Sequence, residues 1–143
     1  MTLPELPPHL HERIEALAAE GDALAAEARY EEAIGVYDRA LALVPEPKHD
    51  WEASTWLLAA IGDAAFLGGR FDTARKALDH AMTCPGAVGN PFLHLRRGEV
   101  ALEQGDEDVA VDELMRAYMA EGREIFAQED AKYLAFLSTR AAL

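Results

Sequence analysis

The residue types that most often carry catalysis are sparse in this chain and lie far apart. The two serines are Ser54 and Ser138, and neither lies in the motif that presents a nucleophilic hydroxyl on a tight turn. The stretch "GGRF" joins two predicted helices, and it lacks the lysine and the spacing of a phosphate-binding loop. We therefore predict no catalytic residue and no cofactor.

The histidines and the cysteine do not form a recognisable metal-binding pattern. His9 and His11 stand two apart at a predicted helix start, with no carboxylate or cysteine motif beside them. His80 adjoins Asp79 on a predicted helix, which favours a surface position. Cys84 is the only cysteine, which excludes an intrachain disulfide and a thiolate cluster, and it resembles a small apolar residue at a helix end. We predict no bound metal.

The charge balance of the chain is strongly acidic. Aspartate and glutamate number 26 against 13 lysine and arginine, a net charge of −13. Nucleic acids and anionic membranes need cationic partners, so the balance disfavours them. It favours a basic protein partner or, alternatively, only a well-solvated surface. The opening residues lack the basic and apolar regions of a secretory signal, and no stretch reaches the roughly 18 apolar residues of a membrane span, so we expect a cytoplasmic protein.

The elements that must position any site are predicted to be helices. Alanine, leucine, glutamate and arginine dominate, all of them good helix formers, and glycine and proline punctuate the chain at helical intervals. Asp50 is predicted to cap one helix, and Asn90 another that begins at Pro91. The helix that Asp50 caps is predicted at 50–67, and the remaining predicted helices cover residues 8–28, 30–43, 71–83, 107–121 and 129–139.

A pattern of small and bulky residues recurs three times. It starts from three glycines, Gly21, Gly62 and Gly98, which are 41 and 36 residues apart. Twelve residues after each glycine comes an alanine, sixteen after comes a bulky residue, and nineteen after comes another alanine. These positions are Ala33, Ala74 and Ala110; Tyr37, Leu78 and Leu114; and Ala40, Ala81 and Ala117. Small residues let helices approach closely, and the bulky residue fills the gap, so Ala33, Ala74 and Ala110 are predicted to be buried.

This pattern resembles the tetratricopeptide repeat (TPR), whose period is about 34 residues. The resemblance implies an all-α, TPR-like solenoid of three antiparallel helix pairs and a C-terminal capping helix. We expect one domain, with repeats at about 10–45, 50–86 and 90–122 and the cap at about 129–140. His94 replaces the usual large apolar residue, which predicts partial burial rather than catalysis. The cap is predicted to use Phe126, Tyr133, Phe136 and Leu137.

In TPR arrays the first helix of each pair lines a concave groove, and the resemblance carries this role onto particular residues here. An acid follows each repeat glycine, which predicts an acidic ladder beside three aromatic anchors. The predicted partner-binding residues are Asp22, Asp63, Glu99, Trp56, Phe66 and Phe92. Such a groove suits a basic protein or peptide. An alternative interpretation is that Trp56 and Phe66 only pack between helix pairs.

Two hypotheses for function follow, and both describe a non-catalytic binding protein. The tail "EGREIFAQEDAKYLAFL" is similar to the ends of small acidic bacterial immunity proteins, which bind and neutralise a cognate toxin. The alternative is a general TPR adaptor or chaperone for a basic protein or peptide. Co-chaperones that hold the acidic tails of heat-shock proteins need lysine, arginine and asparagine in the groove, and those residues are missing at the predicted positions.

Overall fold

The computed structural model describes residues 5–143, and every regular element in that range is a helix. The chain divides into two compact units. The N-terminal unit ends at Val88, and the C-terminal unit begins at Gly89. The all-α prediction is confirmed, while the prediction of one domain stays a prediction.

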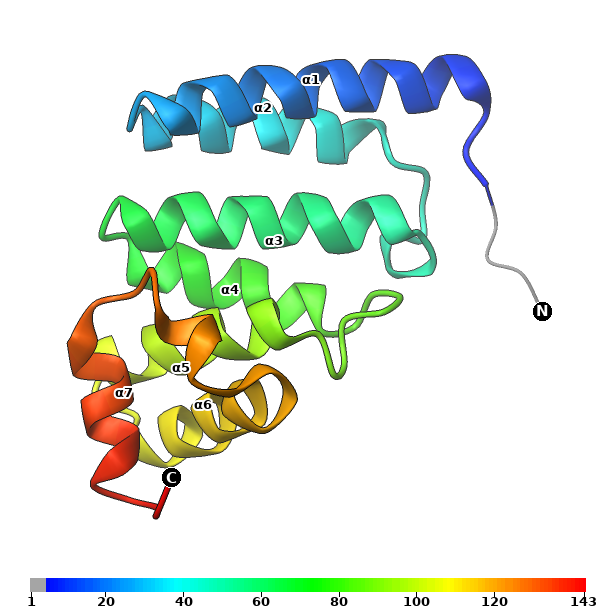
Figure 1. The fold of residues 1–143 in the computed structure, drawn as a ribbon. Coiled ribbons are helices and arrows are strands. Elements are labelled where there is room, and N and C mark those ends of the chain that lie inside the picture. The colour runs from blue at the N-terminus through cyan, green and yellow to red at the C-terminus, as the bar shows by residue number, and fades with distance from the viewer. Residues whose placement is uncertain (1–4) are drawn as a thin grey trace. The chain divides into compact units, whose positions relative to one another are not determined.

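The N-terminal unit consists of two antiparallel helix pairs. Helix α1 packs against α2, α3 packs against α4, and α2 lies against α3 (Figure 1). The bounds are α1 Pro8–Ala26, α2 Tyr30–Leu43, the short 3-10 helix η1 Lys48–Asp50, α3 Glu52–Leu67 and α4 Phe71–Ala81. The first two predicted pairs are therefore present, with ends that differ from the prediction by about two residues.

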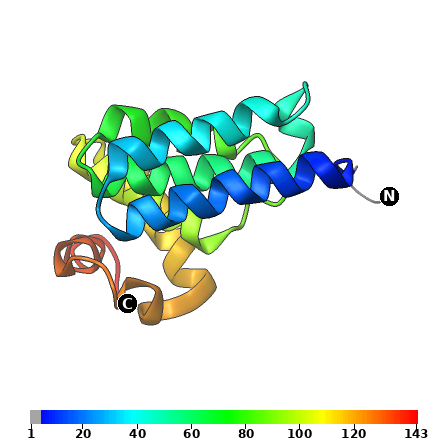
Figure 2. The ribbon, with the colours of Figure 1, turned by 90° about the horizontal axis from the view of Figure 1, so that it is seen from above.

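The C-terminal unit holds the third pair and the end of the chain. Helix α5 packs against α6, and the elements after α6, which are orange and red in Figure 2, contact this pair. The bounds are α5 Pro91–Glu103, α6 Glu107–Glu121, the 3-10 helix η2 Gly122–Phe126 and α7 Ala131–Ser138. The predicted cap at Asn90 is confirmed, because its Oδ1 accepts hydrogen bonds from the amides of Phe92 at 3.0 Å and Leu93 at 3.3 Å.

The predicted cap at Asp50 is wrong. Asp50 ends η1, where its amide donates to the Pro47 carbonyl at 3.1 Å, and α3 begins two residues later. Trp51 occupies the capping position and makes no side-chain cap. The extended residues before η1 end in proline, and the chain then takes one tight turn before the α-helix can begin.

The repeated small residues pack as the sequence pattern predicts. A methyl group added to each repeat glycine would lie 2.5–2.6 Å from the bulky side chain sixteen residues later, so only glycine fits. These contacts are Gly21 with Tyr37, Gly62 with Leu78, and Gly98 with Leu114. The three alanines that follow the glycines by twelve residues, Ala33, Ala74 and Ala110, are fully buried. Each helix pair therefore closes on the same small-to-large contact.

The apolar residues after α6 cover part of the C-terminal unit. Phe126, Tyr133 and Leu137 are buried, and Phe136 is half-buried beneath the Arg140 guanidinium, 5.1 Å from the centre of the ring. Helix α7 contacts α6 and η2. The predicted burial of this apolar stripe is thus confirmed for three residues and partial for the fourth.

Candidate functional site

Two of the predicted acidic residues converge on one tyrosine in the N-terminal unit. The Tyr37 hydroxyl donates a 2.6 Å hydrogen bond to Asp22 Oδ1. Burial raises the pKa of Tyr37, and the hydrogen bond to Asp22 and the charges of Asp22 and Asp63 raise it further. Asp22 on α1 and Asp63 on α3 therefore both act on this hydroxyl, which stays protonated at physiological pH. Asp22 is exposed and Asp63 is partly exposed.

The two aromatic residues predicted on α3 differ in their surroundings. Trp56 is 39% exposed, which places it at the surface. Phe66 is half-buried, and its ring lies 6.0 Å from that of Phe71 on α4 at an angle of 49°. The packing interpretation thus describes Phe66 better than Trp56.

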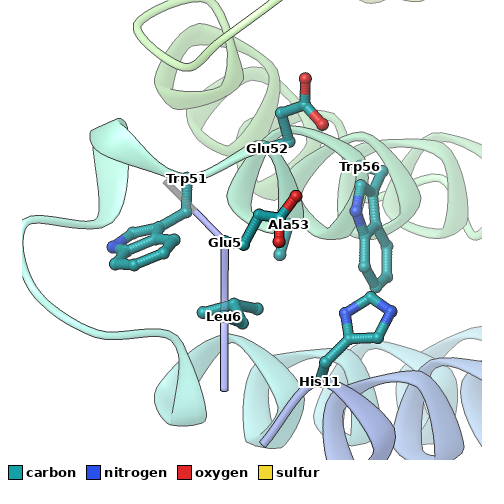
Figure 3. Close-up of a pocket in the computed structure, with 7 residues that line it drawn as sticks. All are labelled: Glu5, Leu6, His11, Trp51, Glu52, Ala53 and Trp56. Carbon is teal, nitrogen blue, oxygen red and sulfur yellow. The ribbon is translucent and has the colours of Figure 1, made fainter. Parts of the chain in front are cut away.

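Trp56 also forms one wall of a cavity of about 340 Å³ that the sequence analysis did not predict. In Figure 3 the indole of Trp56 stands over the imidazole of His11, and Glu5 and Leu6 of the segment before α1 are seen between Trp51 and Trp56. The lining residues are Glu5, Leu6, His11, Trp51, Glu52, Ala53 and Trp56. The spacing of repeat residues cannot reveal this cavity, because it depends on where the segment before the first repeat lies.

The cavity carries carboxylates that no cation of the described chain neutralises. Within residues 5–143 neither Glu5 nor Glu52 has an ion-pair partner. His11 is held by Glu15, with 2.9 Å between Nε2 and Oε1. An exposed indole beside two unpaired carboxylates is a suitable environment for a cation.

The cavity and the Asp22–Asp63 pair lie toward opposite ends of the same two helices. Helices α1 and α3 run in the same direction (Figure 1). Trp56 and Asp63 are seven residues apart on α3, which is about 10 Å along a helix, whereas His11 and Asp22 on α1 are about 16 Å apart. We call the surface that carries Asp22, Asp63, Trp56 and the cavity the α1–α3 face. An extended segment of about three to five residues spans this distance.

The C-terminal unit differs at the equivalent position, and the expectation that Glu99 lines an open groove is wrong. Glu99 is fully buried, and its Oε1 accepts a 2.6 Å hydrogen bond from Arg96 Nη1. The same Arg96 nitrogen also donates to Glu129, just before α7. The chain after α6 thus brings a second carboxylate onto Arg96 and closes the surface over Glu99.

Burial changes the ionisation of Glu99. It raises the pKa of Glu99 to about 8, against the attraction of Arg96, and the neighbouring Glu129 raises it further. Among residues 5–143 the buried Glu99 Oε2 atom has no hydrogen-bond partner, which costs less for a neutral carboxyl group than for a carboxylate. Burial therefore favours the neutral form of Glu99, which weakens its contribution to an acidic ladder.

A second contact joins the C-terminal segment to α5 one turn further on. The Tyr133 hydroxyl donates to Glu103 Oε1 at 2.8 Å, and Lys132 Nζ lies 2.5 Å from the same oxygen. Phe92, the remaining predicted anchor, is 38% exposed and carries the Arg96 guanidinium 5.2 Å from the centre of its ring. Phe92 is thus at the surface but already occupied by a cation of its own helix.

His94 has a structural role between α5 and α6. It is buried more completely than predicted, at 5% exposure. Its Nε2 accepts from the Gly89 amide at 3.0 Å, so the ring is neutral and its Nδ1 donates to Glu113 Oε2 at 2.6 Å. Arg97 Nη1 donates to the other oxygen of Glu113 at 2.8 Å. The group joins two helices and leaves no ring nitrogen for proton transfer.

The remaining candidates for chemistry are unsuited to it. Cys84 is buried, and burial raises the pKa of its thiol, which disfavours the reactive thiolate. Residues 5–143 contain no group of three or more histidine, cysteine or acidic side chains placed to hold a metal ion. In the same range, no helix is both long and apolar enough to cross a membrane.

Comparison with known proteins identifies the fold through structures alone. No protein-family model matches the chain, and no curated protein matches its sequence. The Yersinia enterocolitica type III secretion chaperone SycD, in complex with a peptide of the translocator YopD, matches with a TM-score of 0.69 and 15% identity over 90% of this chain and 92% of that one. The chain has a TPR-like fold. PcrH in complex with the chaperone-binding region of PopB matches with a TM-score of 0.64 and 15% identity, over 90% of this chain and 91% of PcrH.

Proposed function

We propose that this protein is a non-catalytic adaptor or chaperone that holds an extended, basic segment of a partner protein on the α1–α3 face. The observation that carries the proposal is the composition of that face. It combines an exposed indole at Trp56 with the Asp22–Asp63 pair and with the unpaired carboxylates of the cavity.

The structural comparisons support the adaptor or chaperone hypothesis better than toxin immunity. SycD holds a peptide of YopD, and PcrH holds a region of PopB, so the fold accommodates a segment of another protein. The similarity of the tail to immunity proteins has no counterpart in these structures. We therefore transfer to this chain only the mode of binding, a TPR-like scaffold with a bound peptide segment.

The net charge of the protein favours a positively charged partner. A net charge of −13 attracts basic segments at long range and speeds their encounter with the protein. After contact, a few buried anchors usually carry most of the binding energy, and Trp56 is the exposed aromatic residue on this face that can serve. Steering therefore sets the association rate, and Trp56 sets the lifetime of the complex.

The test uses 15-residue peptides of graded charge, first on an array and then by fluorescence anisotropy at several salt concentrations. Replacement of Asp22 and Asp63 together by lysine should weaken binding of the basic peptides about tenfold or more at low salt, and less as salt screens the charges. The matched control replaces Glu20 and Asp108, which are both exposed and are not among the residues of that face, by lysine and changes the net charge equally. Equal losses in the two double variants, or no loss in either, would contradict the proposal.

A further inference from the structure

We infer that the cavity between the segment before α1 and the start of α3 receives one arginine side chain of the partner. The inference rests on the proposed function, and it adds the identity of one partner residue and the place where it binds. The Asp22–Asp63 pair supplies charge at one end of the α1–α3 face, whereas the cavity at the other end combines charge with an aromatic wall and an enclosed shape.

The aromatic wall of the cavity suits a planar cation. The indole of Trp56 faces the open space beside His11 (Figure 3), and it is 39% exposed without a guanidinium or ammonium group on it in residues 5–143. Phe92, at the same place in its repeat, already carries Arg96 at 5.2 Å. The chain thus fills one such aromatic position with its own arginine and leaves the other open.

The charges at the cavity complement a guanidinium group. Glu5 and Glu52 approach from two different segments, and neither has an ion-pair partner within residues 5–143. The imidazole of His11 is directed to Glu15, so it does not compete for them. A carboxylate accepts two parallel hydrogen bonds from a guanidinium, an arrangement that an ammonium group cannot reproduce.

The size and the lining of the cavity favour arginine over lysine. About 340 Å³ is at the lower end of the volumes that hold small ligands, and it admits one long side chain. Leu6 and the buried Ala53 offer apolar surface to the methylene groups of that side chain. Arginine also loses less hydration than lysine when it stacks on an aromatic ring.

The experiment uses three small probes, the N-acetyl methylamides of arginine, lysine and citrulline. Citrulline has nearly the shape of arginine but no charge, so it separates charge from shape. The readout is the nuclear magnetic resonance signal of the indole N–H groups, of which the chain has two, assigned with a Trp51→Phe variant. We expect arginine to shift the Trp56 signal saturably, lysine to bind several-fold more weakly, and citrulline to give no saturable shift. A citrulline shift equal to that of arginine would overturn the inference.

Variants of the lining test the same assignment. Glu52→Gln and Trp56→Ala should each weaken the arginine probe about tenfold; in Trp56→Ala the signal followed is that of Trp51, the other indole of the lining. Glu20→Gln, an exposed position of α1 outside the cavity, should leave the affinity unchanged. An unchanged affinity in Glu52→Gln would overturn the inference. If the cavity variants have no effect while charge reversal at Asp22 and Asp63 weakens the basic peptides, the cavity inference fails and the proposed function stands. If the arginine probe binds as expected while charge reversal has no effect on the peptides, the proposed function fails.

Discussion

Helices α3 and α5 occupy the same place in successive helix pairs, yet their outer surfaces are used differently. Both carry an aromatic residue six positions before the repeat glycine, and Trp56 and Phe92 are almost equally exposed, at 39% and 38%. Both carry an acid directly after the glycine. Asp63 is partly exposed, whereas Glu99 is fully buried. The repeat thus reproduces the aromatic position but not the environment of the acid.

The difference arises from the chain after α6. In the C-terminal unit, Glu129 reaches Arg96 and Tyr133 reaches Glu103, so the surface of α5 is bonded at two successive turns. In the N-terminal unit the equivalent acid, Asp63, stays partly exposed. A repeat position therefore fixes how a residue lies within its own helix pair. Later chain segments decide whether that residue still meets solvent.

The largest expected effect tests how firmly the C-terminal segment is held. Leu137 is fully buried, so Leu137→Ala should lower the free energy of opening of the C-terminal unit by about 2–5 kcal/mol. Amide hydrogen exchange measures this unit by unit. The matched control is Leu67→Ala, at an apolar position of α3 that is 48% exposed, where the cost should stay within about 0.5 kcal/mol. Similar protection in α7 of both variants would mean that the segment is loosely attached and that the contrast with α3 is weak.

The repeated contacts could be predicted from the sequence because they depend on residues within one helix pair. The contact of Gly21 with Tyr37 recurs at Gly62 and Gly98, so three copies of one spacing indicate a single packing geometry. The cap at Asn90 is likewise local, since its side chain reaches amides only two and three residues away. Contacts within one helix pair or one helix cap can therefore be predicted from the types and spacing of nearby residues.

The burial of Glu99 and the cavity at Trp56 could not be predicted for a common reason. Both depend on segments outside the repeats, residues 5–6 in one case and the stretch around Glu129 in the other. A repeat pattern does not predict where segments outside the repeats lie. The error at Asp50 is smaller in scale, because a single 3-10 turn after Pro47 moved the helix start.

The second prediction concerns the pH dependence of stability that the burial of Glu99 should produce. The folded chain raises the pKa of Glu99 to about 8, mainly through burial. The unfolded chain releases this proton nearer the ordinary pKa of 4.5. The stability that the neutral group contributes is therefore complete below about pH 4.5 and is lost as the pH rises to about 8. The stability of the wild type relative to Glu99→Gln should fall over this window, as measured by thermal unfolding at pH 5, 6, 7 and 8.

Glu103 provides the control, because its pKa is shifted in the opposite direction. The hydrogen bond from Lys132 lowers the pKa of Glu103 against a smaller effect of burial, and the hydrogen bond from Tyr133 lowers it further. Its contribution is lost only as the pH falls below the ordinary range of glutamate, so the difference between wild type and Glu103→Gln should stay flat from pH 5 to 8. A flat profile for Glu99→Gln as well would mean that Glu99 is ionised in the folded protein and that the segment over α5 encloses a charge.

The smallest expected effect compares two tyrosines that bond to acids in the two units. Tyr37 donates to Asp22, and Tyr133 donates to Glu103. Replacement of either by phenylalanine removes one hydrogen bond and should cost about 0.5–1.5 kcal/mol, because water can replace the hydroxyl at the exposed Asp22 and Lys132 remains on Glu103. Chemical denaturation of both variants measures these costs.

Binding should distinguish the two substitutions where stability does not. Tyr37→Phe frees the carboxylate of Asp22 to turn away from Asp63, which disperses the negative charge of the α1–α3 face. A basic peptide should then dissociate somewhat faster, with its association rate nearly unchanged because the net charge is the same. Tyr133→Phe alters only the contact of α7 with α5 and should leave both rates unchanged. If the two variants change peptide dissociation equally, the acids of α1 and α3 have no advantage over those of α5, and the distinction between the open and the covered surface has no consequence for binding.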